Sequence, residues 1–585
     1  MDIKILDKLT AEKIAAGEVI ENPASVVKEL VENSIDAGAT IISVEIEGGG
    51  KNFIAVTDNG NGIKPADLSL AFKRFATSKL NAIKDLDSLA SLGFRGEALP
   101  SIAAVSKVEL TSRNEESLAA SKIVFEGGEL VEQTEAGAPK GTRVVVRDLF
   151  FNTPGRLKFL RADSIESAKI SSLLSEISLA YPGIAFKLNS GKRDVIKTTG
   201  DGNLLHVIGA LYGNDSAKAM IKISRKKSDL DIRLDGYISA PHLTRSSRRW
   251  ITLIVNGRLV KNAMLTNAIE RAYSDLIPRQ RHPIAVLWLS IPPAKLDVNV
   301  HPAKTEIRFL EPETVKNNVY RAVKQSVQDS PGSPKRLTDF NYDLEPPLNS
   351  LQTTFLWEKT LPEATYKTDH TSDTVHDLLS VKPGYLMGES YTESYRLIGQ
   401  FLQSYLLVQK GDELLLIDQH AAHERINYDV LERNSGADSN KNSIQLIMPF
   451  KIEFPPSWSD RLQDLIPVLN DHGFHLEWIG EDSYVIRSVP FNFSTDTSSE
   501  QIYDLIENIL ASDCDNNDEY EKLIRKNIAC HRSVKAKQPL SREEMEKLIK
   551  ELIQTPNSDY CPHGRPTTIR FNRSQIEKWF QRKGR

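Results

Sequence analysis

Cysteine and long apolar runs are scarce in this sequence. Its 585 residues include three cysteines, Cys514, Cys530 and Cys561, which cannot form a disulfide framework. The longest apolar runs, such as 414–417, fall far short of the ~20 residues that span a bilayer. The first residues do not read as a signal peptide either. We therefore expect a cytoplasmic protein in a reducing compartment, with no membrane partner.

An excess of charge of one sign is also lacking. The net charge is −4, and the apolar (40%) and charged (26%) fractions are those of ordinary globular proteins. This balance alone argues against a nucleic-acid binder, but the charges are unevenly spread. Basic residues recur between Arg245 and Arg281, whereas acidic residues gather in 329–393 and 513–521. A local contact with DNA therefore stays open.

The length predicts several domains. Helix and strand patterns alternate over 1–205 and again over 206–327, which indicates two α/β units. The segment 328–393 is rich in Ser, Thr, Pro and Asp without sustained periodicity, as in a flexible linker. Order returns near Tyr395, so 394–585 forms a C-terminal α+β domain. The fold class is therefore a multidomain combination of α/β and α+β units.

Local patterns predict several elements inside these units. Asn22 suits the N-cap of a helix and Pro23 its first position, and Gly38 suits its end. Alternating residues predict a half-buried strand over 42–47, and a second strand ends at Asp58. In the second unit we expect strands at 250–255 and 284–291 with a helix at 266–273, and in the C-terminal domain a buried strand at 414–417.

One face of the first helix carries reactive polar groups. Glu29, Asn33 and Asp36 follow one another at spacings of four and three, so they share a helix face. A carboxylate and an amide placed in this way can activate a water molecule and hold a metal ion. For these residues alone, a solvated polar face is the simpler explanation.

Glycine-rich elements follow in a fixed order. Asp58 precedes Gly60 and Gly62; a carboxylate there can accept a hydrogen bond from an amine, and the glycines let the backbone approach a ligand. The run 93–99 places small residues before a helical stretch and can present N–H groups to phosphate. Gly141 and Thr142 open a further strand. The sequence has no Gly-x-x-x-x-Gly-Lys-Ser/Thr motif, so any phosphate site is of another kind.

Together these motifs resemble those of the GHKL (Bergerat-fold) ATPases. The motif Ile-Ala-Ala-Gly-Glu-Val-Ile at 14–20 and the run Gly-Phe-Arg-Gly-Glu-Ala-Leu at 93–99 narrow the resemblance to the MutL family of DNA mismatch-repair proteins. The resemblance implies a Bergerat-type ATPase domain, a ribosomal-S5-like βαβ second domain and a C-terminal dimerisation domain, hence a homodimer. It also implies ATP and Mg²⁺ as ligands, MutS and DNA as partners, and a place at the bacterial nucleoid.

The resemblance also assigns roles to residues of the nucleotide site. It makes Glu29 the general base, Asn33 the Mg²⁺ ligand and Asp58 the residue that reads adenine, supported by Thr142. Lys304 would reach the γ-phosphate from the second domain and stabilise the transition state. The other nucleotide-binding residues would be Gly60, Gly62, Thr77, Ser78, Lys79, Gly93, Phe94, Arg95, Gly96, Glu97, Ala98 and Leu99.

The basic stretch of the second unit has two interpretations. A solvated basic face explains it as well as a nucleic-acid contact does. By resemblance, a groove between two such domains binds DNA without sequence preference and with a strong dependence on salt. Arg258 is then the leading candidate, followed by Arg245, Arg248, Arg249 and Lys261.

The C-terminal domain contains a second group of ligand-type residues. A helix starting near Asp418 would place His420 and Glu424 four residues apart on one face, a suitable spacing for two metal ligands. Cys561 and His563 lie two apart, and Cys530 adds a further thiol. A buried cysteine and ordinary surface histidines are the alternative to a metal site.

The same residues resemble two signatures of the MutL proteins that nick DNA. The resemblance implies a Zn²⁺ or Mn²⁺ site formed by Asp418, His420, Glu424, Cys561 and His563 with Cys530 nearby, and a catalytic role for Asp418. The sequence departs from these signatures where Asp429 replaces a glutamate and where 529–532 reads Ala-Cys-His-Arg. An ATP-driven scaffold with a structural metal site is one rival; another GHKL machine, such as a topoisomerase subunit or a chaperone, is a second.

A short motif lies between these two signatures. Gln445, Ile447 and Pro449 resemble the peptide with which replication proteins dock on the sliding clamp. An edge strand that ends at a proline explains the motif as well.

Overall fold

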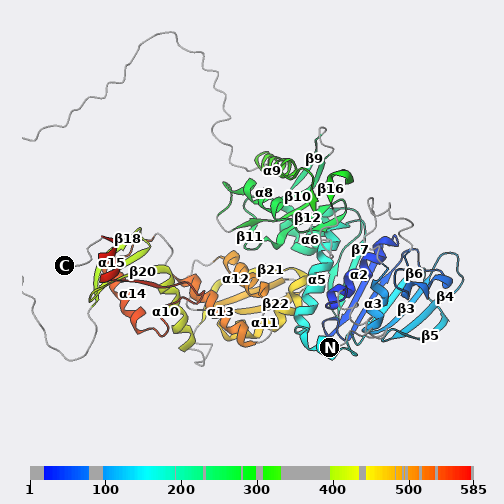
Figure 1. Cartoon of the computed structure of the whole chain (residues 1–585), viewed down its shortest axis with the longest axis horizontal. Helices are drawn as coiled ribbons and strands as arrows, with labels where there is room; N and C mark the ends of the chain where they lie inside the picture. Colours follow the sequence, from blue (N-terminus) through cyan, green and yellow to red (C-terminus); the bar gives the residue numbers. More distant parts are fainter. Residues whose placement is uncertain are drawn as a thin grey trace, which may run out of the picture.

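Figure 1 shows a computed structural model of the whole chain. Among the residues that it describes, no helix is long and apolar enough to cross a membrane. The expected linker, 328–393, falls almost entirely outside them. The described residues are 19–77, 96–191, 193–227, 232–278, 281–297, 307–330, 395–433, 443–480, 483–490, 493, 498–512, 517–533 and 538–580.

The first domain is built on an eight-stranded sheet with the order β5-β4-β3-β6-β2-β1-β7-β8. The two predicted strands are confirmed as β1 and β2, and β1 buries every second residue. Asp58, at the end of β2, lies opposite Ile42 of β1 and Thr142 of β6. The strands are β1 (Ile41–Glu47), β2 (Phe53–Asp58), β3 (Lys107–Arg113), β4 (Ala120–Glu126), β5 (Glu129–Ala136), β6 (Gly141–Arg147), β7 (Ala185–Ser190) and β8 (Arg193–Lys197).

Helices pack against this sheet and close its core. The predicted cap is confirmed, because the Asn22 side chain accepts a hydrogen bond of 3.0 Å from the amide of Ser25 and Pro23 opens the helix. Val26, Val27 and Val31 of this helix are fully buried against β1 and β2. The helices are α2 (Pro23–Asp36), α3 (Ala98–Ala104), α4 (Pro154–Phe159), α5 (Asp163–Ala180), α6 (Leu204–Tyr212) and α7 (Asn214–Lys218).

The second domain contains the expected βαβ unit. Strands β12 and β15 are parallel, and α8 connects them. The five-stranded sheet has the order β13-β12-β15-β10-β9. Its elements are β9 (Met220–Lys227), β10 (Ile232–Ser239), β12 (Ile251–Val255), β13 (Arg258–Val260), α8 (Ala263–Tyr273), β15 (Ala285–Ser290) and α9 (Pro312–Gln328), with the short strands β11 (Thr244–Arg245), β14 (His282–Pro283), β16 (Leu296–Asp297) and β17 (Arg308–Phe309).

The C-terminal half divides into two sheets. The first has the order β18-β19-β20-β24 and is covered by α10 and α14. The second has the order β21-β23-β22 and packs with α11, α12 and α13. The elements are β18 (Tyr395–Phe401), β19 (Tyr405–Lys410), β20 (Glu413–Asp418), α10 (Gln419–Arg433), β21 (Ser443–Glu453), α11 (Ser459–Asp471), β22 (His475–Gly480), β23 (Ser483–Pro490), α12 (Ser499–Ala511), α13 (Asn517–Arg532), α14 (Arg542–Gln554), β24 (Thr568–Asn572) and α15 (Arg573–Trp579).

The segment 443–533, which we call the outer segment, lies against the first two domains in Figure 1. Trp250 and Ile284 of the second domain share one hydrophobic core with it. The indole Nε1 of Trp250 donates a hydrogen bond of 2.5 Å to Glu507 of α12, and Arg281 pairs with Asp504 of the same helix. The outer segment is therefore joined to the second domain by apolar packing and by buried polar contacts.

Candidate nucleotide site and metal cluster

Asp58 is the centre of a hydrogen-bonded network at the end of β2. Its Oδ1 accepts from the amides of Gly60 at 2.8 Å and Thr142 at 3.3 Å, and its Oδ2 accepts from Ser34 Oγ at 2.8 Å. Burial raises the pKa of the Asp58 carboxyl, although these hydrogen bonds oppose the shift. The carboxylate is therefore fixed in orientation and poorly solvated, which suits it to accept a further hydrogen bond from a ligand amine.

The glycines around Asp58 are required by close backbone approaches. Gly62 has φ +69°, and a Cβ there would lie 2.2 Å from the carbonyl oxygen of Arg113. A Cβ on Gly141 would lie 2.0 Å from the carbonyl oxygen of Asp58. Only glycine therefore lets these loops pack together at the edge of the site.

The helix face predicted from spacing is present in α2. Glu29, Asn33 and Asp36 are all half-buried, and Ser34 beside Asn33 connects this helix to Asp58. A carboxylate and an amide oxygen on one face form a donor set that suits Mg²⁺. The donor set therefore fits the cation that the nucleotide would bring.

Of the predicted nucleotide-binding residues in 77–79 and 93–99, five are described. Thr77, Gly96 and Glu97 precede α3, and Ala98 and Leu99 begin it. The amide of Phe75 donates to the carbonyl of Gly96 at 3.2 Å. The predicted residues Ser78, Lys79, Gly93, Phe94, Arg95 and Lys304 lie outside the described residues.

In the C-terminal domain, Glu424 brings the predicted metal ligands together. One carboxylate oxygen of Glu424 lies 3.2 Å from His420 Nε2, and the other lies 3.2 Å from His563 Nδ1. Cys530 joins His420 and Glu424, and Cys561 joins Glu424 and His563, with ligand atoms within 4.8 Å of one another in each group. Five of the six predicted ligands, all except Asp418, therefore form one cluster around a buried carboxylate.

The chemistry of this cluster suits a soft or borderline divalent metal. Burial alone would raise the pKa of Glu424, but hydrogen bonds from His420 and Cys530 and the charges of His420 and His563 outweigh it and lower that pKa to about 2. An ionised carboxylate with imidazole and thiol neighbours is the donor set that Zn²⁺ takes in proteins.

Asp418 and Asp429 have other partners than this cluster. The Oδ1 of Asp418 accepts from the amides of His420 at 2.9 Å and Ala421 at 3.0 Å, so it caps the start of α10. Asp429 is buried and pairs with Arg433 at 2.7 Å. Neither carboxylate belongs to the two ligand groups found among the described residues.

Comparison with known families covers all three units. The first domain matches the histidine kinase-, DNA gyrase B- and HSP90-like ATPases over residues 20–136. Residues 208–328 match the DNA mismatch repair protein C-terminal domain, and residues 398–540 match the MutL C terminal dimerisation domain.

Complete relatives match over almost the full length. DNA mismatch repair protein MutL of Listeria monocytogenes serotype 4b is 36% identical over 603 residues, which cover 99% of each chain. The MutL protein of Pelotomaculum thermopropionicum is 38% identical over 615 residues, covering 99% of this chain and 100% of that one. The chain belongs to the MutL family of DNA mismatch repair proteins. It therefore combines a GHKL ATPase domain, which implies ATP and Mg²⁺, with a dimerisation domain, which supports a homodimer.

Two solved structures are similar to parts of this MutL chain. The Aquifex aeolicus MutL ATPase domain complexed with ADP is 30% identical with a TM-score of 0.37, covering 47% of this chain and 94% of that one. The N-terminal domain of a DNA repair protein is 26% identical with a TM-score of 0.48, covering 54% of this chain and 97% of that one.

The basic residues of this MutL chain do not share one environment. The guanidinium of Arg245 lies over the rings of Trp250 and Tyr503, so it faces the outer segment. Arg248 is exposed and pairs with Glu270 at 2.7 Å. Arg258 is half-buried, whereas Arg249 and Lys261 are exposed. The exposed Arg249 and Lys261 are therefore more accessible to a partner than the half-buried Arg245 and Arg258.

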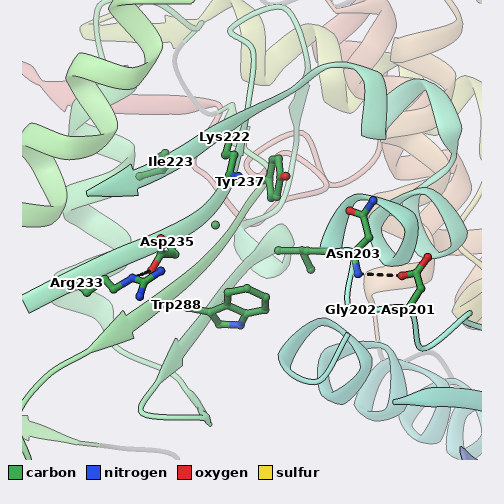
Figure 2. A pocket seen from close by; sticks show the side chains of 11 residues that line it. Asp201, Gly202, Asn203, Lys222, Ile223, Arg233, Asp235, Tyr237 and Trp288 are labelled. Carbon is green, nitrogen blue, oxygen red and sulfur yellow. Dashed lines mark hydrogen bonds and ion pairs between the residues drawn. The ribbon is translucent and has the colours of Figure 1, made fainter. Parts of the chain in front are cut away.

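Two further features lie outside the nucleotide site and the metal cluster. Ile447 (102% exposed) and Met448 (78% exposed) project from β21, which has a bulge between Gln445 and Phe450. β21 is an edge strand, but it continues past Pro449 to Glu453 and so does not end at the proline. A separate cavity of about 460 Å³ lies between the segment 201–204 of the first domain and the sheet of the second domain, where Tyr237 and Trp288 line it (Figure 2). None of the site residues predicted for this MutL chain lines that cavity.

Sequence reasoning missed two hydroxyls of the nucleotide site. Ser34 donates to Asp58, and Ser112 Oγ lies 2.9 Å from Thr142 Oγ1. Ser34 directly follows Asn33 in the chain, so its place beside a predicted Mg²⁺ ligand was a usable signal. Ser112 carries no such signal, because it reaches the site only through the register of β3 against β6.

Proposed function

We propose that this chain is a mismatch-repair ATPase with a latent DNA-nicking activity, and that it couples mismatch recognition by MutS to incision of a strand. The observation that carries the first part is the Asp58 carboxylate, which is held by three donors beside the Glu29–Asn33 face. Such a fixed carboxylate suits the exocyclic amine of adenine.

In the proposed hydrolysis, positioning and charge neutralisation supply most of the rate. Glu29 orients the attacking water and takes its proton, and Asn33 would hold Mg²⁺, which would supply neutralising charge for the phosphates. Gly96 to Leu99 form part of the cover over the phosphates, and Lys304 of the second domain stabilises the charge that develops during transfer. Because Lys304 belongs to another domain, ATP binding would favour closure of the two domains.

The nicking activity is supported by the cluster around Glu424. We assign His420, Glu424, Cys530, Cys561 and His563 as ligands for Zn²⁺ or Mn²⁺, because imidazole, thiol and carboxylate donors converge there. A bound metal would polarise a phosphodiester and stabilise the charge of its transition state. Asp418 would act from the start of α10, next to His420.

The partners follow from the same assignments. Arg258, Arg249 and Lys261, with Arg248 and Arg245, would contact DNA phosphates on chromosomal DNA in the cytoplasm. The exposed Ile447 and Met448 support docking of the segment Gln445 to Pro449 on the sliding clamp, because solvated apolar side chains on an edge strand favour a partner.

Nicking of supercoiled plasmid in Mn²⁺ tests the nuclease, and Asp418→Asn is the sharpest variant. Asparagine caps a helix as well as aspartate does, so α10 should persist while the charge is lost. We expect nicking to disappear and ATP hydrolysis to stay normal. Unchanged nicking by this variant would contradict the role of Asp418, and no nicking by the unmodified chain would favour an ATP-driven scaffold with a structural metal.

A further inference from the structure

A cavity of about 830 Å³ opens beside the metal cluster. Residues of α10, α13 and the segment before β24 line it, and Cys561 belongs both to the cavity and to the cluster. The ligand atoms of Cys561, Glu424 and His563 lie within 4.8 Å of one another. A molecule bound in this cavity would therefore lie directly against the proposed incision site.

Three cationic side chains line the cavity. Arg425 comes from α10, and Lys522 and Lys526 come from α13. The two lysines are four residues apart, so they share one face of α13. Lys522 is exposed and Lys526 is half-buried, which leaves at least one amine in contact with solvent.

The acidic residues of the lining do not cancel these charges. Glu519 and Asp559 are the two carboxylates of the lining, against three cations. Asp559 is already paired with Arg570, at 2.9 Å, and Arg570 does not line the cavity. The lining is therefore positive, and an anion is the ligand that it favours.

The cavity also contains a guanidinium held in a fixed position and an exposed aromatic ring. The Nε of Arg425 donates to the carbonyl of Pro556 at 3.1 Å, and its guanidinium lies 5.6 Å from the centre of the Tyr428 ring. These contacts fix the guanidinium in place. Tyr560, which directly precedes Cys561 in the chain, also lines the cavity. Its side chain is 60% exposed and offers a ring on which a base can stack.

We propose that this cavity, which we call the backbone site, binds the phosphate backbone of a DNA strand and positions the strand for incision at the neighbouring cluster. The inference rests on the proposed nuclease function. Lysine and arginine neutralise backbone phosphates without reading bases, and an aromatic ring can stack on any base. Arg425, Lys522 and Lys526 are positioning residues, since none of them belongs to the ligand set. They hold phosphates that flank the one attacked.

A photo-crosslinking experiment tests the site without metal or incision. The full chain carries p-benzoylphenylalanine in place of Tyr560 and is irradiated with a labelled duplex in EDTA. The matched control carries it in place of Trp579, which is 65% exposed on α15 and does not line the cavity. We expect crosslinked DNA for position 560 only, and at least about fivefold less when Lys522→Glu and Lys526→Glu are added.

A kinetic experiment separates positioning from chemistry. In plasmid nicking, Lys522→Glu with Lys526→Glu should raise KM about tenfold and leave kcat unchanged. The control pair Lys547→Glu with Lys550→Glu reverses two exposed charges on α14, outside the cavity, and should change neither constant.

The outcomes separate the cavity from the nuclease. Equal crosslinking at positions 560 and 579 would overturn the assignment of the backbone site while leaving nicking intact. So would crosslinking and a KM that do not change when Lys522 and Lys526 are replaced. Lysine-dependent crosslinking in a chain that never nicks would instead overturn the proposed nuclease and, with it, the positioning role, leaving the cavity a DNA-binding site alone.

Discussion

Glu29 lies on the face of α2 that also carries Asn33, and it is half-buried there. Removing its carboxylate in Glu29→Ala takes away the proposed base but none of the groups that hold Asp58. We expect ATP hydrolysis to fall at least about a hundredfold while nucleotide binding persists. Phosphate release and binding of a fluorescent ATP analogue measure the two. Hydrolysis at the normal rate would show that another group is the base.

Ser34 gives a finer test of the nucleotide site. Its hydroxyl holds Asp58 Oδ2 at 2.8 Å, so Ser34→Ala frees one side of that carboxylate without touching Glu29 or Asn33. A lost hydrogen bond to a charged group costs about 1.5–3 kcal/mol, and part of this should appear as weaker ATP binding, about tenfold. Calorimetric titration with ATP measures it.

The control for that variant is Ser117→Ala. Ser117 also donates to a side chain within the first domain, that of Asn114, but it is not among the three donors that hold Asp58. An equal loss of ATP affinity in both variants would show that the effect of Ser34→Ala is general rather than local.

The site residues that could be predicted from the sequence are those that belong to short motifs of neighbouring residues. Asp58, Gly60 and Thr142 were expected, and the structure brings them into one network. Ser112 could not be, because its contact with Thr142 depends on which residues of β3 and β6 stand opposite each other. Pairing register is a long-range property that no local pattern contains.

At the scale of elements, the turn after β2 is held by a close backbone approach. Gly62→Ala would place a methyl group 2.2 Å from the carbonyl oxygen of Arg113 and would keep an L residue at φ +69°. Gly202→Ala imposes similar backbone strain, at φ +80°, in open space. We expect about 1 kcal/mol of destabilisation at Gly202 and several more at Gly62, because only Gly62 must move its neighbours.

Thermal unfolding of the two variants measures this difference. The melting temperature should fall clearly further for Gly62→Ala, and its ATP binding should weaken because Asp58 and Gly60 share the displaced turn. Equal melting temperatures would mean that the turn relaxes at little cost.

The elements themselves were largely predictable, and the exceptions have physical reasons. The start of α2, the strands β1 and β2 and the crossover β12–α8–β15 are confirmed, because caps, alternation and spacing are local signals. The run 414–417 was expected to be wholly buried, but β20 buries only Leu415 and Ile417. It lies in an antiparallel sheet, where α10 and α14 cover one face and the other stays accessible.

At the scale of the whole molecule, the contact between the second domain and the outer segment was not predictable at all. Trp250 donates a hydrogen bond to Glu507, which is 257 residues further along the chain, and no periodic pattern in the sequence connects the two. The acidic helix α12 supplies Asp504 and Glu507, and the second domain supplies Arg245, Arg281 and Trp250. Two arginines of the basic stretch are therefore occupied by acidic or aromatic side chains of the same protein.

This arrangement predicts competition between α12 and DNA for the same basic surface. Asp504→Arg places a second positive charge against Arg281, which is only 19% exposed in its side chain, so the repulsion is poorly screened. We expect the outer segment to detach, with faster hydrogen–deuterium exchange in α12 and around Trp250. The affinity for DNA should rise several-fold at low salt, because Arg245 and Arg281 become free to meet phosphates.

The matched control is Asp471→Arg, which adds the same charge to the end of α11 in the outer segment, at an exposed position. If both variants raise the affinity equally, net charge alone is the cause, since each adds two positive units. If only Asp504→Arg raises it, and exchange in α12 rises with it, release of the arginines is the cause. Unchanged exchange in α12 would show that the pair of Arg281 and Asp504 is not what holds the two parts together in solution, and it would contradict the proposed competition.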